Sequence, residues 1–209
     1  MNLIELEAKF WLPHLLDVRQ RLIELGAALR SPRTLERNLR FDTLDHSLSA
    51  KDQVLRLRQA HQAFLTYKRP ASSFEEREEF EFEIGDFEMA QRVLEALGFE
   101  VVHRYEKYRE IFRLNDCLVM LDEVPYGCFT EIEGPDLESI QSTGTKLGLY
   151  WEQRVQRTYL DMFKELREQL PNKPPDATFA AFDGIHKIDV RMLKLQRGDQ
   201  PPQREGHTG

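Results

Sequence analysis

Cysteine is scarce in this sequence, and long apolar runs are missing altogether. The 209 residues include two cysteines, Cys117 and Cys128, both in apolar, strand-like stretches and without CxxC or Cys/His metal-ligand spacing. We therefore expect reduced core thiols in a cytoplasmic protein. No apolar run has the roughly 18 residues that a membrane span needs, and charges at Glu5, Glu7 and Lys9 interrupt the first stretch. We expect neither a membrane span nor a secretory signal.

Basic residues are in deficit. Lys and Arg number 29 against 36 Asp and Glu, which gives a formal net charge of −7. Because a nucleic-acid-binding protein generally needs a net basic surface, we expect no nucleic-acid partner. A local basic site inside an acidic shell is still compatible with this balance. Hydrophobic residues make up 41% of the chain, which is enough to build a core without disulfides or metals.

Alternating polar and apolar residues predict a chain rich in strands, with a few amphipathic helices between them. Asp86, for example, is suited to start a helix that Gly98 ends. We expect strands over 2–12, 28–42, 53–60, 62–69, 75–84, 100–114, 117–123 and 128–133, and helices over 14–25, 87–97, 136–147 and 152–169. We expect one domain over 1–170 and a partly disordered tail over 171–209, where prolines and glycines gather.

Charged residues recur at every second position of the predicted strands. Since successive side chains of a strand point to opposite sides of a sheet, each of these strands has one charged face and one apolar face. The charged face carries acids at Glu5, Glu7, Glu79, Glu81, Asp122, Glu131 and Glu133, and bases at Lys9, Arg56, Arg58, Lys68, Arg77, Lys107 and Arg109.

For any one strand, a solvent-exposed face is the plain interpretation of such a pattern. Like charges two residues apart lie roughly 7 Å from each other and repel, so their repetition on most strands favours a partner that uses them. A closed sheet explains the pattern if the charged faces line a solvated tunnel and helices cover the apolar faces. Carboxylates bind Mg²⁺ or Mn²⁺, and Arg and Lys bind phosphate oxygens, so this tunnel suits a polyanion with a divalent metal.

Short motifs follow one another along the chain in a defined order. They are ELEAK at 5–9, FDT at 41–43, LRLR at 55–58, TYKRP at 66–70, REEFE at 77–81, LGFE at 97–100, KYREIF at 107–112 and VMLDEVPYGCFTEIEG at 119–134. This order resembles the CYTH superfamily, the triphosphate tunnel metalloenzymes, over about residues 1–165. The resemblance implies an α+β fold, in which an eight-stranded antiparallel β-barrel forms a tunnel with a charged interior and helices packed outside.

The resemblance also implies roles for individual residues. The implied metal-binding carboxylates, for Mg²⁺ or Mn²⁺, are Glu5, Glu7, Glu131 and Glu133, with Glu79, Glu81 and Asp122 at further acidic positions of the family. The implied substrate-binding residues are Lys9, Arg56, Arg58, Lys68, Lys107 and Arg109, and we expect Arg157 on the last helix to reach the same ligand.

One position departs from the family pattern. Many hydrolytic members have a tyrosine two residues before the Asp of the FDT-like motif, where it pairs with a lysine of the fourth strand to orient a water. Here that position is Arg40. A guanidinium stays protonated, so we expect Arg40 to bind phosphate at the catalytic centre. Lys68, the retained lysine, would act alone as a base only if neighbouring cations lowered its pKa.

These observations predict a divalent-metal-dependent triphosphatase acting on a small-molecule triphosphate. The substrate stays open between inorganic tripolyphosphate, thiamine triphosphate and a nucleoside triphosphate. The first alternative is a class IV-type adenylate cyclase, which makes cyclic AMP and pyrophosphate from ATP. The second is a non-catalytic module that binds polyphosphate or nucleotide, against which the acidic pairs weigh, because anion binding alone does not need them. We expect a monomer or a homodimer.

Overall fold

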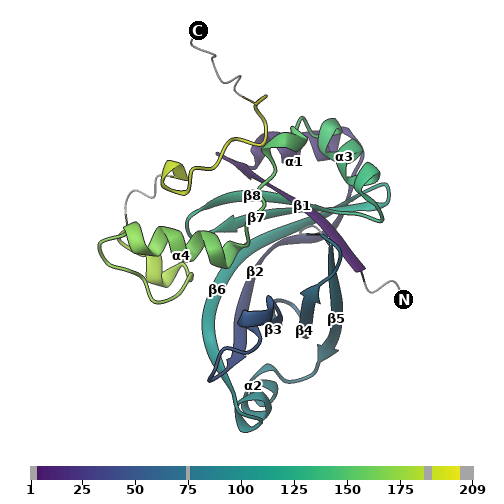
Figure 1. Ribbon diagram of the computed structural model, residues 1–209. Coiled ribbons are helices and arrows are strands. Elements are labelled where there is room, and N and C mark those ends of the chain that lie inside the picture. The colour runs from purple at the N-terminus through teal and green to yellow at the C-terminus, as the bar shows by residue number, and fades with distance from the viewer. Residues whose placement is uncertain (1–3, 74–75, 186–189, 203–209) are drawn as a thin grey trace.

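Eight strands close into one antiparallel barrel (Figure 1). The computed structural model describes residues 4–73, 76–185 and 190–202. The strands are β1 (Ile4–Leu12), β2 (Ala28–Thr43), β3 (Val54–Gln59), β4 (Ala63–Pro70), β5 (Glu76–Ile84), β6 (Phe99–Leu114), β7 (Cys117–Val124) and β8 (Gly127–Glu133). Their order around the barrel is β1-β5-β4-β3-β2-β6-β7-β8. The predicted fold, a closed eight-stranded antiparallel barrel with helices outside, is confirmed.

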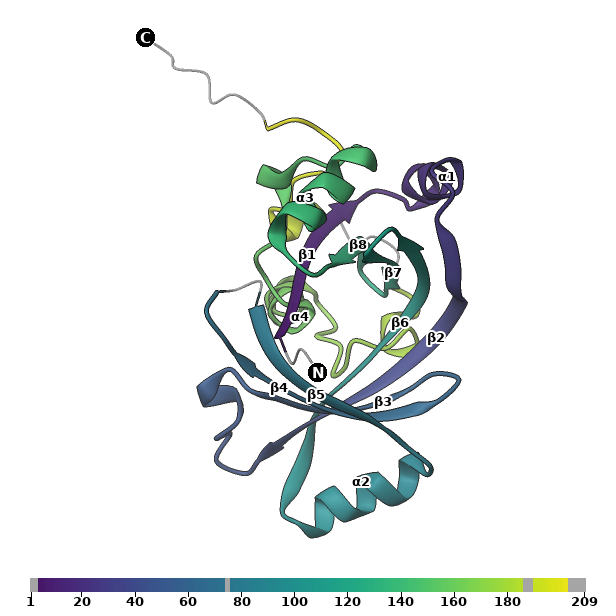
Figure 2. The same ribbon diagram turned by 90° about the vertical axis from the view of Figure 1, so that its right-hand side faces the viewer.

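Over the described ranges, four α-helices lie outside the barrel. They are α1 (Leu16–Glu24), α2 (Phe87–Ala96), α3 (Leu137–Lys146) and α4 (Tyr159–Gln169). In Figure 2 the strands form a ring and α4 is seen end-on within its outline, whereas Figure 1 shows α4 to one side of the strands. Helix α4 therefore covers one end of the barrel. In the described part of the chain, no helix is long and apolar enough to cross a membrane.

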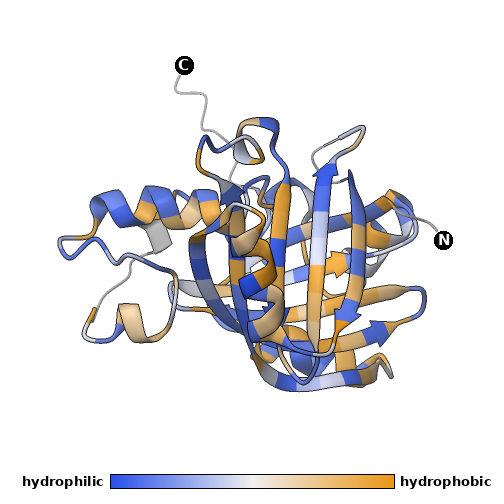
Figure 3. Cartoon of the chain, turned by 90° about the horizontal axis from the view of Figure 1, so that it is seen from below, coloured by the Kyte–Doolittle hydropathy of each residue, from blue (hydrophilic) through white to orange (hydrophobic). Residues whose placement is uncertain are grey.

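Apolar side chains of the strands pack against these helices in three clusters, whereas Phe80 and Phe82 on β5 are exposed. One cluster joins β1, β6, β7 and β8 to α1 and α3, a second lies under α4, and a third lies under α2. Fully buried members include Phe10 in the first cluster, Phe129 in the second and Leu57 in the third. Figure 3 shows hydrophilic and hydrophobic residues alternating along the strands. The barrel is thus polar inside and apolar outside, as the alternation predicts.

Helix α4 begins later than the sequence predicts. We expect a helix over 152–169, but residues 151–153 form a 3-10 turn and α4 starts at Tyr159. The intervening chain lies against β1, where the Val155 N–H donates to the Lys9 carbonyl at 2.7 Å. Thr158 then starts the helix, because its side chain accepts from the Asp161 N–H while the Asp161 carboxylate accepts from the Thr158 N–H.

Beyond residue 170 the described chain continues to pack on the barrel. Ala177 bonds to the edge of β6, donating to the Arg104 carbonyl at 3.0 Å and accepting from the Glu106 N–H at 3.0 Å. Leu193 is fully buried beneath α4, and the Gly198 N–H donates to the Trp11 carbonyl at 2.9 Å. The packed unit therefore extends past the boundary that we expect at residue 170, and residues 203–209 lie outside the described chain.

The loop between β2 and β3 is held by one buried carboxylate. Asp42 accepts N–H groups from Thr43 at 2.8 Å, Leu48 at 2.9 Å and Ser49 at 3.0 Å. Burial alone would raise its pKa, but these hydrogen bonds outweigh it and lower the pKa of Asp42 to about 2. The middle residue of the FDT motif therefore closes a loop, which explains why an acid stands near the end of β2.

We expect Asp42→Ala to lower the free energy of unfolding by about 3 kcal/mol, because three buried N–H groups lose their charged acceptor. Urea unfolding at neutral pH, followed by circular dichroism, measures this change. Asp116→Ala, which removes an exposed carboxylate from the β6–β7 turn, is the control and should change the free energy by less than about 0.5 kcal/mol. Equal effects of the two substitutions would contradict the role given to Asp42.

Candidate active site in the barrel interior

A cavity of about 750 Å³ occupies the barrel interior and extends to α4. Most of the charged residues singled out in the sequence line this cavity. They are Glu5, Glu7, Lys9, Arg40, Arg56, Arg58, Lys68, Arg77, Glu79, Glu81, Lys107, Arg109, Glu131 and Glu133. The antiparallel register explains the convergence, because Glu7 lies opposite Glu133 and Lys9 opposite Glu131 on neighbouring strands.

One group of carboxylates gathers where β1 meets β5 and β8. Burial and the neighbouring charge of Glu5 raise the pKa of Glu133 to about 7. Burial also raises the pKa of Glu5; the charge of Lys68 opposes this shift and the charge of Glu79 adds to it. For Glu7, burial and the charge of Glu131 raise the pKa. These acids repel one another, so a divalent cation that pairs with them would be favoured.

The donor set at this group fits Mg²⁺ or Mn²⁺, which prefer carboxylate oxygens. Among the described residues, no three carboxylate, imidazole or thiol groups already stand in coordinating positions. Instead the ammonium of Lys68 lies between two acids, bonded to Glu5 and 3.1 Å from a Glu79 oxygen. A metal at this group would require these side chains to rearrange around Lys68.

A second group of charges is centred on Asp122, which is 0% exposed and lies just beneath the cavity wall. Its carboxylate accepts from Lys107 at 3.0 Å, from Arg109 twice at 2.6 Å and from the Tyr159 hydroxyl at 2.9 Å. Both oxygens are therefore occupied by cations and a hydroxyl. The metal-binding role expected of Asp122 does not fit this geometry, and its carboxylate orients Lys107 and Arg109 instead.

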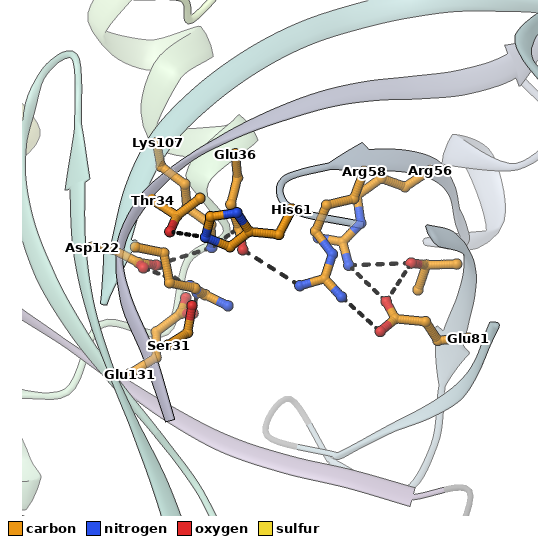
Figure 4. Close-up of polar contacts among 12 residues, drawn as sticks. Ser31, Thr34, Glu36, Arg56, Arg58, His61, Glu81, Lys107, Asp122 and Glu131 are labelled. Carbon is orange, nitrogen blue, oxygen red and sulfur yellow. Dashed lines mark hydrogen bonds and ion pairs between the residues drawn. The ribbon is translucent and has the colours of Figure 1, made fainter. Parts of the chain in front are cut away.

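Glu131 and Glu81 also hold cations in place. A Glu131 oxygen lies 3.1 Å from the Lys9 ammonium, and Glu131 also bonds to Arg109. Burial opposes ionisation of Glu131, but the charges of Lys9 and Arg109 outweigh burial and hold the pKa of Glu131 well below its usual range. Glu81 accepts from Arg58 at 2.7 Å (Figure 4). It also accepts from the Thr66 hydroxyl at 2.7 Å. In this structure both acids pair with cations of the cavity wall, which leaves fewer of their oxygens open to a metal than at Glu133.

The sequence-based interpretation missed two residues of the site. Glu36 on β2 is buried, with one oxygen 3.5 Å from Arg58 and the other 3.8 Å from Lys107 (Figure 4). Tyr159 places its ring 4.3 Å from the Lys9 ammonium and 5.5 Å from that of Lys107. Glu36 shares the strand parity of Arg40, which is the signal that could have identified it.

Two expected ligand-binding residues behave differently in the structure. Arg157 does not line the cavity; its guanidinium bonds to Glu165 and donates to the Leu193 carbonyl at 3.0 Å. These contacts fasten α4 to the segment that follows, and they place the guanidinium of Arg157 outside the cavity lining in which we expect it. Lys68 does line the cavity. Burial lowers the pKa of Lys68, but the charges of Glu5 and Glu79 have the larger effect and raise this pKa overall. A raised pKa does not fit the role of a base that acts alone, which would need a lowered one.

His103 lies at the α4 end of the cavity and is 6% exposed, stacked on Tyr105 and packed against Phe163. Burial, with the charges of Arg40 and Lys164, lowers its pKa to about 4, while Asp176 opposes the shift. Because the unfolded chain binds this proton more tightly, the stabilising effect is complete above about pH 6.5 and is lost as the pH falls toward 4.

We therefore expect the wild type to lose about 3 kcal/mol of unfolding free energy at this residue between pH 7 and pH 4. His103→Phe keeps an aromatic ring in the stack and cannot titrate, so the substituted protein should lose correspondingly less. Urea unfolding at several pH values gives both curves. Parallel curves for the two proteins would show that His103 does not carry this acid sensitivity.

The family model for the CYTH domain matches residues 3–159. A Methanocaldococcus jannaschii protein named "Putative adenylate cyclase" is 31% identical over 135 residues, covering 63% of this chain and 77% of that protein. The chain belongs to the CYTH domain family.

Solved structures share the fold of this chain. A conserved hypothetical protein from Pyrococcus furiosus superposes with a TM-score of 0.66 at 30% identity, covering 75% of this chain and 98% of that one. A protein from Pyrococcus horikoshii has a TM-score of 0.66 at 27% identity, with the same coverage of 75% and 98%. These structures match the barrel and leave about a quarter of this chain outside the aligned part.

Proposed function

We propose that this protein is a divalent-metal-dependent triphosphatase. One observation supports the proposal above all: a row of cations and a separate group of carboxylates face the same cavity. The cations suit the phosphate oxygens of a triphosphate, and the carboxylates suit the metal that such substrates carry. A module that binds anions without chemistry would not need the second group.

The cations are held in position before the ligand arrives. Lys9 pairs with Glu131, Arg58 with Glu81 and Glu36, and Lys107 and Arg109 with Asp122. Phosphoryl transfer asks mainly for positioning and for stabilisation of negative charge. Donors that are already oriented cost little reorganisation during the reaction, so this arrangement fits hydrolysis of a terminal phosphoryl group.

Glu5, Glu7 and Glu133 are the residues that would hold the metal, with Glu79 beside them. A bound Mg²⁺ or Mn²⁺ would supply charge neutralisation at the phosphate oxygens. Lys68 would lie next to the same oxygens as a protonated donor, since its ammonium already contacts Glu5 and Glu79. No side chain of the cavity is assigned as a general base, and the attacking water is oriented by the charged groups around it.

Adenylate cyclase activity is the second candidate, because the Methanocaldococcus jannaschii relative carries that name. Both reactions use a bound triphosphate, but cyclisation of ATP releases pyrophosphate and cyclic AMP, whereas hydrolysis of the terminal bond releases phosphate. The products therefore separate the two functions directly.

The test is a product panel. The protein is incubated with tripolyphosphate, thiamine triphosphate and ATP, each with Mg²⁺ or Mn²⁺, and phosphate, pyrophosphate and cyclic AMP are quantified. We expect metal-dependent release of phosphate from at least one substrate and no cyclic AMP. Cyclic AMP and pyrophosphate in equal amounts from ATP would favour the cyclase, and no product from any substrate would favour a binding module.

A further inference from the structure

Arg40 occupies an unusual place in the cavity wall. On β2 it lies directly opposite Arg56 of β3, and on the other side opposite His103 of β6. All three residues line the cavity. Like charges directly opposite each other on neighbouring strands destabilise a sheet unless something compensates them. The Arg40–Arg56 pair therefore calls for negative charge between or above the two guanidiniums.

The protein itself does not provide that charge to Arg40. Within the described residues, the other Lys and Arg side chains of the barrel wall each have a carboxylate oxygen within 4.0 Å: Lys9, Arg56, Arg58, Lys68, Arg77, Lys107 and Arg109. Arg40 instead donates to the Gln53 carbonyl at 3.2 Å. No carboxylate of the described chain comes within 4.0 Å of Arg40 or of Lys164, which lines the same cavity from α4.

The acids nearest to Arg40 are already engaged elsewhere. Asp42 accepts the N–H groups of its own loop, Asp52 pairs with Arg77 at 2.7 Å, and Asp161 accepts from the Thr158 hydroxyl at 2.6 Å. Burial lowers the pKa of Arg40, while these three acids and Tyr105 raise it without offsetting the burial. Arg40 is thus a partly buried cation whose compensation is incomplete. The exposed Lys164 lines the same cavity, and the charges of both residues act on His103 between β6 and α4.

Aromatic rings at this end of the cavity already pack on other rings. The ring of His103 has Tyr105 at 5.5 Å and Phe163 at 5.0 Å. Tyr126 packs on Phe129 and Phe182, and the ring of Tyr159 contacts Phe129 and the Lys9 ammonium. A nucleobase or another flat organic group would have to compete with these contacts, whereas an anion would meet two uncompensated cations.

We propose that Arg40 and Lys164 form an anion subsite at the α4 end of the cavity, and that this subsite binds the free terminal phosphate of inorganic tripolyphosphate. The inference rests on the proposed function and names its substrate class. The end of tripolyphosphate that would bind at this subsite is an unesterified phosphate that carries up to two negative charges. In ATP the phosphate at that end is the α-phosphate, which is esterified to the nucleoside and carries one negative charge. Arg40 and Lys164 therefore favour the inorganic substrate over organic triphosphates.

The experiment is isothermal titration calorimetry with tripolyphosphate and with ATP, in EDTA so that no hydrolysis occurs. Wild type should bind tripolyphosphate at least about tenfold more tightly than ATP. Arg40→Gln should weaken tripolyphosphate binding by about ten- to a hundredfold, the loss typical of a charge-assisted hydrogen bond, and ATP binding by less than about threefold. Lys164→Gln, at an exposed position where folding is not at risk, should weaken tripolyphosphate binding by about three- to tenfold.

Two exposed cations outside the cavity serve as controls, one on the same strand as Arg40 and one on another helix. Arg37→Gln removes a cation from β2 whose side chain is 65% exposed and which does not line the cavity, and Lys146→Gln removes an exposed cation from α3. Both should leave tripolyphosphate binding within about twofold of wild type. Arg40→Lys, which keeps the charge, should recover part of the affinity that Arg40→Gln loses.

Three results would overturn the subsite: wild type binding ATP as tightly as tripolyphosphate, no binding of tripolyphosphate at all, or unchanged tripolyphosphate affinity in both Arg40→Gln and Lys164→Gln. Failure of the proposed function looks different. If tripolyphosphate binds with the predicted dependence on Arg40 and Lys164 but no metal releases phosphate, the subsite stands and the triphosphatase does not.

Discussion

Glu133→Gln should lower kcat/KM for triphosphate hydrolysis with Mg²⁺ by about a thousandfold, the scale expected when a metal loses an anionic ligand. Glu133 lies opposite Glu7 in the β1–β8 ladder. Burial and the charges of the neighbouring carboxylates raise the pKa of Glu133. The amide has nearly the same shape but no charge, so the barrel should fold as before. Steady-state kinetics of phosphate release at several Mg²⁺ concentrations measures the loss.

The same substitution should weaken Mn²⁺ binding in the absence of substrate, which a titration calorimeter detects independently of turnover. Glu95→Gln is the control, because Glu95 is exposed on α2 and its carboxylate bonds only to Gln91 among the described contacts. That variant should match wild type in both assays. If Glu133→Gln kept activity within tenfold of wild type at limiting Mg²⁺, Glu133 would not be a metal ligand.

Asp122→Ala should lower the free energy of unfolding by about 3–5 kcal/mol, the cost of leaving buried charges without their partner. Lys107, Arg109 and the Tyr159 hydroxyl all bond to this one carboxylate. Glu36 and Glu131 remain near the two cations and would recover part of the interaction. Urea unfolding of the purified variant measures the change, with Asp116→Ala again as the exposed control.

A change below about 1 kcal/mol for Asp122→Ala would contradict the role of Asp122 as the centre of the buried charge network. Activity gives a second readout. Because Asp122 orients Lys107 and Arg109, the variant should have a raised KM for triphosphate even under conditions where it is fully folded. An unchanged KM would mean that the two cations hold their positions without Asp122.

The alternation of charged and apolar side chains along each strand predicts much of this architecture. A pair such as Arg56 and Arg58, or Glu131 and Glu133, must point to one side of its strand, since side chains alternate along a sheet. An exposed face would explain such a pair on any one strand, but the repetition of such pairs on most strands favours a shared, solvated interior. The closed barrel, with its charged cavity and helices outside, is the predicted result.

Parity could not predict which charges pair inside the cavity. The strand β2 changes register against β6 three times, twice before Thr34 and once between Arg40 and Phe41, so the spacing along the whole strand does not give one consistent face. Glu36 and Arg40 lie on the regular stretch between these shifts and share a face, but their spacing does not show that Glu36 pairs with Arg58 and Lys107. The position of Tyr159 depends on where α4 begins, and the contact of Val155 with β1 delays that start. Asp122 has the residue type of a metal ligand, and only its three partners reveal a different task.

The most direct test of the account is a crystal structure of the protein grown with tripolyphosphate and Mn²⁺, with an anomalous difference map recorded at the manganese edge. We predict an anomalous peak among Glu5, Glu7 and Glu133, and phosphate density along Lys9, Arg56, Arg58 and Arg109 within the 750 Å³ cavity. Manganese outside the barrel, or tripolyphosphate bound away from these cations, would contradict the central claim that the cavity binds a triphosphate together with a divalent metal.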